Sequence, residues 1–338
     1  GKYIIRNHDK GRWNYMCTCI VIKEKDKYFG RNLDLEYTFN ECVVITPRNY
    51  PFYFRNKEVI HHHYAMIGMA TVVEGYPLYA DAMNEKGLAM AGLNFPGNAH
   101  YFSWDDKKNN ITPFELIPYL LSKYSKVEEV RLALENIQLL DESFKKEMPL
   151  APLHWMITDG VDSVIIESTK DGLHVYDDIY GVLTNNPPYE YHKWNMYNYL
   201  HMSPAYPDNK VSKHVDLKPY GNGFGSIGIP GDCSPASRFV RACFVKDNSV
   251  FGDDEEENIT QFFHILDAVS MVKGSVLTQE GKMDYTTYSC GMNLTRGMYY
   301  YKTYENNQIT CMKLFNRDLD TEKLYTFELN RKQNMDIR

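Results

Sequence analysis

The chain has 338 residues, of which 43% are hydrophobic and 24% are charged, and its formal net charge is -7. This composition is typical of an ordinary globular protein and excludes a disordered or fibrous one. No apolar run approaches the roughly 18 residues that a bilayer-spanning helix needs, and the acidic balance without a Lys/Arg block argues against nucleic acid or a membrane surface as a partner.

Seven cysteines lie far apart and form no CxxC pair. This pattern is typical of free thiols in a reducing compartment, so we expect a cytoplasmic protein. Residues 1–16 carry basic residues but lack the continuous apolar stretch of a signal peptide. We expect residues 17–338 to form one domain, and residues 1–16 to be an N-terminal extension that is either removed, as a short pro-segment, or non-native, or the product of an upstream start.

Strand signals dominate the first hundred residues. Two β-hairpins are predicted, one from strands over 18–23 and 27–32 and the other from strands over 78–83 and 88–94, because short polar turns separate the apolar runs. Several of these strands are apolar on both faces, which predicts a sheet covered on both sides.

Helix signals follow the first strands. Thr112 precedes Pro113 and stands three residues before Glu115, which is the pattern of a capping box with proline at the first helical position. Ser125 and Glu128 repeat this pattern before an apolar helix face that extends to Ile137.

Later segments alternate between strand and helix patterns. The predicted elements are four strands between 153 and 184, a helix over 189–200, a helix started by Ser234-Pro235, a helix capped by Thr260 that ends at Gly274, and a strand meander over 285–314. Together they predict an α+β fold with helices on both outer faces of two packed, mainly antiparallel sheets.

Two motifs point toward other functions and are set aside. The run 223–228 matches G-x-G-x-x-G, but Pro219 precedes it and Pro230 follows it, so no helix begins within it as a dinucleotide site requires. We favour a loop that contacts substrate. The run 61–63 is three histidines without a Cys, Asp or Glu cluster at ligand spacing, which favours a solvated strand entry. We predict no cofactor and no metal.

Cys17 directly follows Met16 and begins a strand-like run. A cut between these two residues would leave Cys17 with a thiol and an α-amine, a nucleophile and a base on one residue. The ordinary pKa of a thiol is about 8.5 and that of an α-amine about 7.7 to 8, so proton transfer between them is nearly thermoneutral. An amide nitrogen cannot accept that proton. Core packing is the alternative interpretation of such a cysteine.

Four polar residues add to this pattern, each with an ordinary alternative. Arg238 stands at the fourth helical position after Ser234, where a cation opposes the helix dipole, so an anion is expected nearby; the alternative is an exposed side chain that covers apolar surface. Arg31 and Asp34 end a strand and could form a turn-closing ion pair. Asn185 precedes a turn-forming Asn-Pro pair.

Eight runs in the chain resemble the choloylglycine hydrolase family, whose bile salt hydrolases and penicillin V acylases are N-terminal nucleophile hydrolases. They occur in family order and extend over nearly everything from residue 16 onward. The runs are Met16-Cys17-Thr18, Tyr28 to Asp34, Thr46 to Tyr50, Asn84 to Leu88, Ala91 to Pro96, Leu153-His154-Trp155, Gly181 to Pro187 and Gly231 to Phe239.

This resemblance implies a four-layer αββα sandwich and a set of roles for the site residues. In it Cys17 is the nucleophile and its α-amine the base, Asp34 holds that amine, Arg31 and Arg238 favour the thiolate, and the Asn94 backbone N–H with the Asn185 side chain forms the oxyanion hole.

Asn94 resembles the bile salt branch, since penicillin V acylases tend to carry tyrosine at this place. The resemblance therefore implies hydrolysis of glycine- or taurine-conjugated bile salts by a homotetramer without a cofactor. Two features depart from the family: sixteen residues precede Cys17, and Cys19 lies on the same strand face as Cys17, where we expect it to pack. The alternatives are a penicillin V or N-acyl-homoserine-lactone acylase, and a non-catalytic amphiphile-binding protein if the extension is retained.

Overall fold

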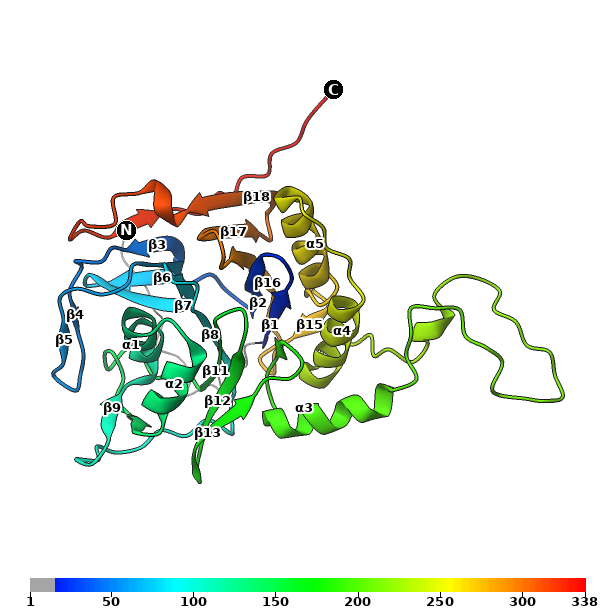
Figure 1. The fold of residues 1–338 in the computed structure, drawn as a ribbon, viewed down its shortest axis with the longest axis horizontal. Helices are drawn as coiled ribbons and strands as arrows, with labels where there is room; N and C mark the ends of the chain where they lie inside the picture. Colours follow the sequence, from blue (N-terminus) through cyan, green and yellow to red (C-terminus); the bar gives the residue numbers. More distant parts are fainter. Residues whose placement is uncertain (1–15) are drawn as a thin grey trace.

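Two large antiparallel sheets lie face to face, and helices cover the outer face of each (Figure 1). This computed structural model describes residues 16–338. The first sheet has seven strands in the order β14-β1-β2-β16-β17-β18, with β15 paired to β16. Its strands are β1 Met16–Lys23, β2 Lys27–Leu35, β14 Val182–Leu183, β15 Val276–Leu277, β16 Met283–Asn293, β17 Met298–Thr303 and β18 Asn306–Lys313.

The second sheet has eight strands in the order β13-β12-β11-β8-β7-β6-β3-β19. Its strands are β3 Cys42–Thr46, β6 Met66–Val73, β7 Tyr76–Asn84, β8 Ala89–Asn94, β11 Leu153–Thr158, β12 Ser163–Thr169, β13 Gly172–Asp177 and β19 Tyr325–Phe327. Two small ladders complete the strands: β4 Phe52–Tyr53 with β5 Val59–Ile60, and β9 Asn109–Ile111 with β10 Ile137–Leu139.

The helices divide between the two outer faces. They are α1 Leu116–Lys123, α2 Val127–Leu134, α3 Tyr189–Asn195, α4 Pro235–Asp247 and α5 Glu255–Asp267, with 3-10 turns η1 Pro113–Glu115, η2 Met196–Tyr199, η3 Phe224–Ser226 and η4 Leu314–Asn316. Phe239 of α4 and Phe262 of α5 pack in the cluster that includes the first sheet, and Leu120 of α1 and Val130 of α2 pack on the second. The predicted αββα sandwich is confirmed.

The strand predictions are accurate and the helix boundaries less so. Both expected hairpins form, as β1–β2 and β7–β8. The capping box of Thr112 and Glu115 is present. At the start of α2, however, the backbone N–H groups of residues 125 and 126 donate to Glu129 and not to Glu128. The helix ends at Leu134, and Ile137 belongs to β10.

Helix α5 begins before the predicted Thr260 cap. Its N-cap is Asp254, whose side chain accepts a 2.8 Å hydrogen bond from the backbone N–H of Glu257. Three glutamates in the first turn favour this start, because negative charge stabilises the positive end of the helix dipole. The helix ends at Asp267, earlier than the predicted Gly274.

The histidine run lies between β5 and β6, and only part of it is solvated. His63 is buried, and its ring nitrogens contact the carbonyl oxygens of Tyr64 at 2.7 Å and Tyr50 at 2.6 Å. The expectation of a solvated run was wrong for this residue. Among residues 16–338, no helix is both long and apolar enough to cross a membrane.

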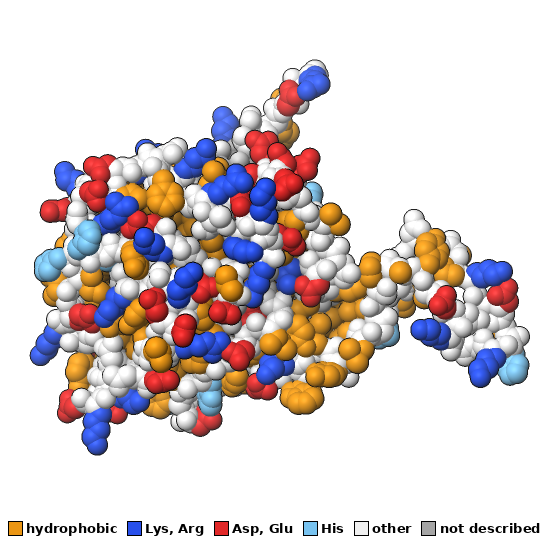
Figure 2. Space-filling view, viewed as in Figure 1, with side chains coloured by type: hydrophobic (Ala, Val, Ile, Leu, Met, Phe, Trp, Pro, Cys, Tyr) orange, Lys and Arg blue, Asp and Glu red, His pale blue; other side chains and the backbone are white. Residues whose placement is uncertain are grey.

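An arm formed by residues 201–229 projects away from the sandwich (Figure 1). Hydrogen bonds join the outgoing and returning segments of the arm. The Ser203 backbone N–H donates to the Gly225 carbonyl at 2.9 Å, and the Tyr206 hydroxyl donates to Asn222 at 2.8 Å. Figure 2 shows hydrophobic side chains gathered over α3 and the base of the arm. The exposed apolar residues of the arm are Tyr206, Val211, Val215, Leu217, Tyr220 and Ile227.

Candidate active site

Cys17 is the second residue of β1, which lies between β14 and β2 in the first sheet. Its side chain is only 3% exposed. In the β1–β2 ladder Cys17 lies opposite Leu33, and Met16 lies opposite Asp34. The short hairpin therefore brings Asp34 beside the peptide bond that joins Met16 to Cys17.

Arg31 approaches Cys17 from the space between the sheets. It lies on β2, opposite Cys19 in register, and its Nη1 donates to the carbonyl oxygens of Ala80 at 2.9 Å and Gly92 at 2.7 Å in the second sheet. These two bonds hold the guanidinium at a fixed place. Its positive charge lowers the pKa of the Cys17 thiol.

Arg238 approaches Cys17 from the opposite face, where α4 covers the first sheet. It is fully buried, and its Nη1 donates to the Cys17 carbonyl at 2.6 Å and to Thr18 Oγ1 at 2.8 Å. Its Nη2 donates to Asn185 Oδ1 at 2.7 Å. The anion expected near this arginine is Asp34, whose charge opposes the fall in the Arg238 pKa that burial causes. The alternative of an exposed arginine was wrong.

Asp34 is fully buried, and burial raises its pKa to about 6, although the charges of Arg238 and Arg31 act in the other direction. Its Oδ1 accepts a 2.6 Å hydrogen bond from Thr286 Oγ1 on β16. Its Oδ2 has no hydrogen-bond partner among the described residues. This second carboxylate oxygen can therefore accept a hydrogen bond from a further donor.

Asn94 and Asn185 lie together beside Cys17. Asn94 ends β8, and Asn185 follows β14 by two residues. The Asn185 Oδ1 accepts from the Cys17 backbone nitrogen at 3.0 Å as well as from Arg238, and its Nδ2 donates to the Asn94 carbonyl at 2.8 Å. Because both partners of Oδ1 are donors, the orientation of the amide is determined. Its second N–H remains for another acceptor.

Opposing effects act on the pKa of the Cys17 thiol. Burial raises its pKa, the charge of Arg31 lowers it, the charge of Asp34 raises it, and hydrogen bonds from the backbone N–H groups of Asp34 and Asn94 lower it. The net direction is upward. The resting group is thus a thiol, and a nearby base is needed to make the nucleophile.

The structure brings all six predicted residues into one connected group, which links two strands of the first sheet, the end of β8 in the second sheet, the segment after β14 and helix α4. Two threonines outside the six predicted residues complete the group: Thr18 binds Arg238, and Thr286 binds Asp34. Thr18 is adjacent to the nucleophile and could have been suspected. Nothing in the sequence pattern marks Thr286, because its place depends on the pairing of β2 with β16.

Cys19 is fully buried and packs in the core cluster with Ile20 and Val182. Burial raises the pKa of its thiol, and the charges of Cys17 and Asp81 add to this effect while Arg31 opposes it. The packing role expected for Cys19 agrees with this environment.

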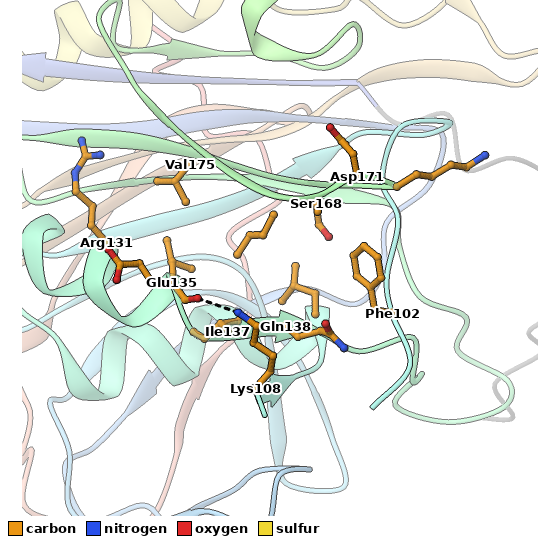
Figure 3. A pocket seen from close by; sticks show the side chains of 14 residues that line it. Phe102, Lys108, Arg131, Glu135, Ile137, Gln138, Ser168, Asp171 and Val175 are labelled. Atoms are coloured by element: carbon orange, nitrogen blue, oxygen red, sulfur yellow. Dashed lines mark hydrogen bonds between the residues drawn. The ribbon is translucent and has the colours of Figure 1, made fainter. Parts of the chain in front are cut away.

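A separate cavity of about 640 Å³ lies between β13 and the segment of α2 and β10 (Figure 3). Two of its cations are already engaged: Lys108 Nζ donates to the Glu135 carbonyl at 3.2 Å, and Arg131 forms an ion pair with Asp177. None of the six predicted site residues lines this cavity. It is therefore distinct from the site at Cys17. Across residues 16–338, no cluster of three or more His, Cys, Asp or Glu side chains is arranged to hold a metal.

The αββα sandwich with a cysteine at the start of a central strand defines the class of N-terminal nucleophile hydrolases. Residues 17–327 match the family described as linear amide C-N hydrolases, choloylglycine hydrolase family. The chain belongs to the choloylglycine hydrolase family.

Similar proteins agree with this assignment. A bile salt hydrolase/transferase of Lactiplantibacillus plantarum is 49% identical over 93% of this chain and 97% of its own length. The structure of a variant of the conjugated bile acid hydrolase from Clostridium perfringens matches with a TM-score of 0.88 and 39% identity, covering 95% of this chain and 99% of that one. The penicillin V acylase of Agrobacterium tumefaciens shares the fold, with a TM-score of 0.75 and 18% identity over 94% of this chain and 95% of that one.

Proposed function

We propose that the protein hydrolyses the amide bond of glycine- or taurine-conjugated bile salts through a thioester on Cys17. One observation carries the proposal: the nitrogen and the carbonyl of Cys17 are both bound by side chains of the site, through Asn185 Oδ1 at 3.0 Å and Arg238 Nη1 at 2.6 Å. The names of the similar bile salt hydrolases support the substrate class.

The reaction begins when the α-amine of Cys17 takes the thiol proton and the sulfur attacks the substrate carbonyl. The carbonyl oxygen gains negative charge in the tetrahedral intermediate. The second N–H of the Asn185 side chain and the backbone N–H of Asn94 would stabilise that charge, each contributing on the order of 2.7 to 4 kcal/mol by comparison with other acyl-transfer enzymes.

The intermediate then collapses to the thioester. The α-ammonium gives its proton to the nitrogen of glycine or taurine, which leaves as an amine. Water, deprotonated by the same α-amine, attacks the thioester and releases the bile acid and the thiol. No cofactor is needed for any step.

Three charged residues would keep Cys17 ready for this chemistry. Arg31 favours the thiolate from one side of the sheet, and Arg238 fixes the backbone of Cys17 from the other. Asp34 Oδ2 would accept a hydrogen bond from the released α-amine. The ammonium would in turn lower the pKa of Asp34 from its raised value, since an opposite charge favours the ionised form.

We infer that the working unit is one hydrolase domain over residues 17–338, released from Met16 and the residues before it. The family model begins at Cys17, which supports this boundary. All seven cysteines are free thiols, which supports a reducing compartment such as the cytoplasm.

The substrate is tested with a chain that begins at Cys17. We expect it to release taurine and glycine from conjugated cholates, measured with an amine reagent and by mass spectrometry of the free bile acid. Penicillin V and an N-acyl-homoserine lactone serve as competing substrates. Release of phenoxyacetate alone would favour the acylase alternative, and binding of bile salt without any turnover would favour an amphiphile-binding protein.

We also propose that the chain assembles into a homotetramer in which the arm packs on another copy. The support is its exposed apolar surface, with Val211 87% and Tyr220 94% exposed. Surface of this kind marks interaction sites in soluble proteins.

Replacing Val211 and Tyr220 together with serine is expected to shift the protein to smaller species, measured by light scattering over a concentration series. Burial of such side chains contributes about 1.5 to 3 kcal/mol each, so the dissociation constant should rise about 100-fold or more. Val161 and Tyr53, which are 63% and 64% exposed and lie outside the arm, give the matched control pair. A wild-type chain that is monomeric at all concentrations would contradict the assembly.

A further inference from the structure

Two buried histidines contact the peptide groups on either side of Asn185. His154 Nε2 lies 2.9 Å from the Thr184 carbonyl oxygen, and His192 Nε2 lies 3.0 Å from the Asn185 carbonyl oxygen. Both rings are fully buried. The two carbonyls belong to the two peptide planes that meet at the Cα of Asn185, so the two rings contact both planes.

The same rings stack on aromatic side chains that follow other site residues. His154 stacks on Phe95 with ring centroids 4.3 Å apart and an interplanar angle of 4°, and Phe95 directly follows Asn94 in the chain. His192 stacks on Phe239 with centroids 4.8 Å apart at 21°, and Phe239 directly follows Arg238. Asn94 and Arg238 both bind the Asn185 side chain, which also accepts from the backbone nitrogen of Cys17.

Each ring is held by its hydrogen-bond partners. Burial lowers the pKa of His192 to about 4, so the ring is neutral at neutral pH, and its contact with a carbonyl places the hydrogen on Nε2. His154 faces an acceptor at each nitrogen, Thr184 O at Nε2 and Glu167 Oε1 at 3.1 Å from Nδ1. Both ring nitrogens of His154 are therefore engaged, one by the backbone of Thr184 and the other by the side chain of Glu167.

We propose that His154 and His192 are positioning residues that fix the two peptide planes flanking Asn185 and so aim its side-chain amide at the oxyanion. This inference rests on the proposed function, because it explains how the proposed oxyanion donor is held. With both planes fixed, the direction of the Asn185 Cα–Cβ bond is fixed as well. The Nδ2 group then needs no reorientation when charge develops on the substrate oxygen.

The contacts of the two histidines form two closed loops that begin and end at Asn185. From Asn185 one path runs through Thr184, the His154 ring and Phe95 to Asn94, and a second runs through the His192 ring and Phe239 to Arg238. Both ends return to the Asn185 side chain. A small displacement in any member therefore moves the amide, and a misplacement of about 1 Å at a reacting group costs on the order of 100-fold in rate.

The first test compares His192→Asn with His192→Gln. Both replacements are polar amides, but only glutamine reaches far enough to place a donor where Nε2 stands. We expect His192→Asn to lower kcat by about 10- to 100-fold with KM changed less than about threefold, because an oxyanion contact acts only in the transition state. His192→Gln is expected to recover most of the loss, and the same pair at His154 is expected to behave alike.

A double-mutant cycle separates positioning from general support of the fold. Asn185→Ala alone should lower kcat by about 100- to 1,000-fold. With that side chain absent, His192→Asn should cost less than about threefold more, since there is no amide left to aim. His174 is the control: its partly exposed ring contacts Asp171 at 3.1 Å and stacks on Tyr176 with centroids 5.9 Å apart, neither of which is one of the six site residues, and His174→Asn should leave kcat unchanged.

A crystal structure of the His192→Asn protein tests the positioning without any substrate. The expected result is an Asn185 side chain that no longer donates to the Asn94 carbonyl. An unmoved Asn185, or losses from His192→Asn and Asn185→Ala that simply multiply, would overturn the inference. If the wild-type chain cleaves no conjugated bile salt, the proposed function fails while the crystal structure still decides the role of the histidine.

Discussion

Replacing Cys17 with alanine is expected to lower the rate of amide hydrolysis by about 10⁵-fold, because no other group at the site can form the thioester. Losing a catalytic nucleophile costs other acyl-transfer enzymes about 10⁴- to 10⁶-fold. The residual rate would come from the oxyanion donors and from binding. Release of taurine measures the effect, and the intact mass after mixing with substrate should show no acyl adduct.

The fold should survive this substitution. Cys17 is 3% exposed, and removing one buried sulfur should lower the free energy of unfolding by about 1 kcal/mol. Cys19→Ala is the matched control, since that thiol is also buried, on the same strand and on the same face. We expect it to keep kcat within about threefold of wild type while losing similar stability. Equal losses of kcat from the two variants would contradict the assignment of the nucleophile.

The parts of the fold that could be predicted are those set by local sequence. The β1–β2 and β7–β8 hairpins follow from apolar runs and short turns, and both formed where expected. Helix boundaries were harder to predict because several residues compete for each cap. Thr260 looked like an N-cap, yet Asp254 has a carboxylate and three glutamates after it, which stabilise an earlier start.

From the sequence, the site could be predicted only where a single residue stood in a chemically unusual position. Arg238 stands near a helix N-terminus, so an anion was expected nearby. The charge of Asp34 fills this role, because it raises the pKa of Arg238 against the effect of burial. The direct bonds of Arg238, however, go to neutral groups, the Cys17 carbonyl, Thr18 and Asn185. Which acceptors a buried guanidinium finds depends on strand order and register, which no local pattern determines.

The contacts of the supporting residues His154 and Thr286 could not be predicted from the sequence for the same reason. His154 belongs to a run that resembles the family, but its contact with Thr184 joins β11 to the end of β14, strands of different sheets. Thr286 reaches Asp34 only because β16 pairs with β2. Long-range register of this kind is set by the packing of the whole sandwich.

The two arginines act on different atoms of the same residue. Arg31 lies between the sheets and affects the sulfur through its charge, whereas Arg238 extends from α4 and binds the carbonyl. Since the two lie on opposite faces of the first sheet, neither can replace the other. Neither arginine contacts the nitrogen of Cys17 in the described part of the chain, and that nitrogen donates to Asn185 Oδ1 at 3.0 Å.

A chain that keeps Met16 joined to Cys17 is expected to be at least about 1,000-fold slower than a chain that begins at Cys17. In the joined form the nitrogen is an amide that donates to Asn185 Oδ1 at 3.0 Å, and its lone pair cannot accept the thiol proton. General acid–base groups contribute about 100- to 10,000-fold, and the burial that raises the pKa of this thiol makes the base more necessary.

The measurement uses two preparations with the same 17–338 sequence, one with a free Cys17 and one that retains Met16, each verified by intact mass. Alkylation of Cys17 by iodoacetamide reports whether its sulfur remains accessible, and equal thermal unfolding shows that the fold is shared. Equal kcat in the two preparations would mean that the base is not the α-amine. If only the free form turns over, the sulfur and the amine of one residue act as a pair, and Asp34, whose Oδ2 has no hydrogen-bond partner within residues 16–338, is the group that should hold that amine.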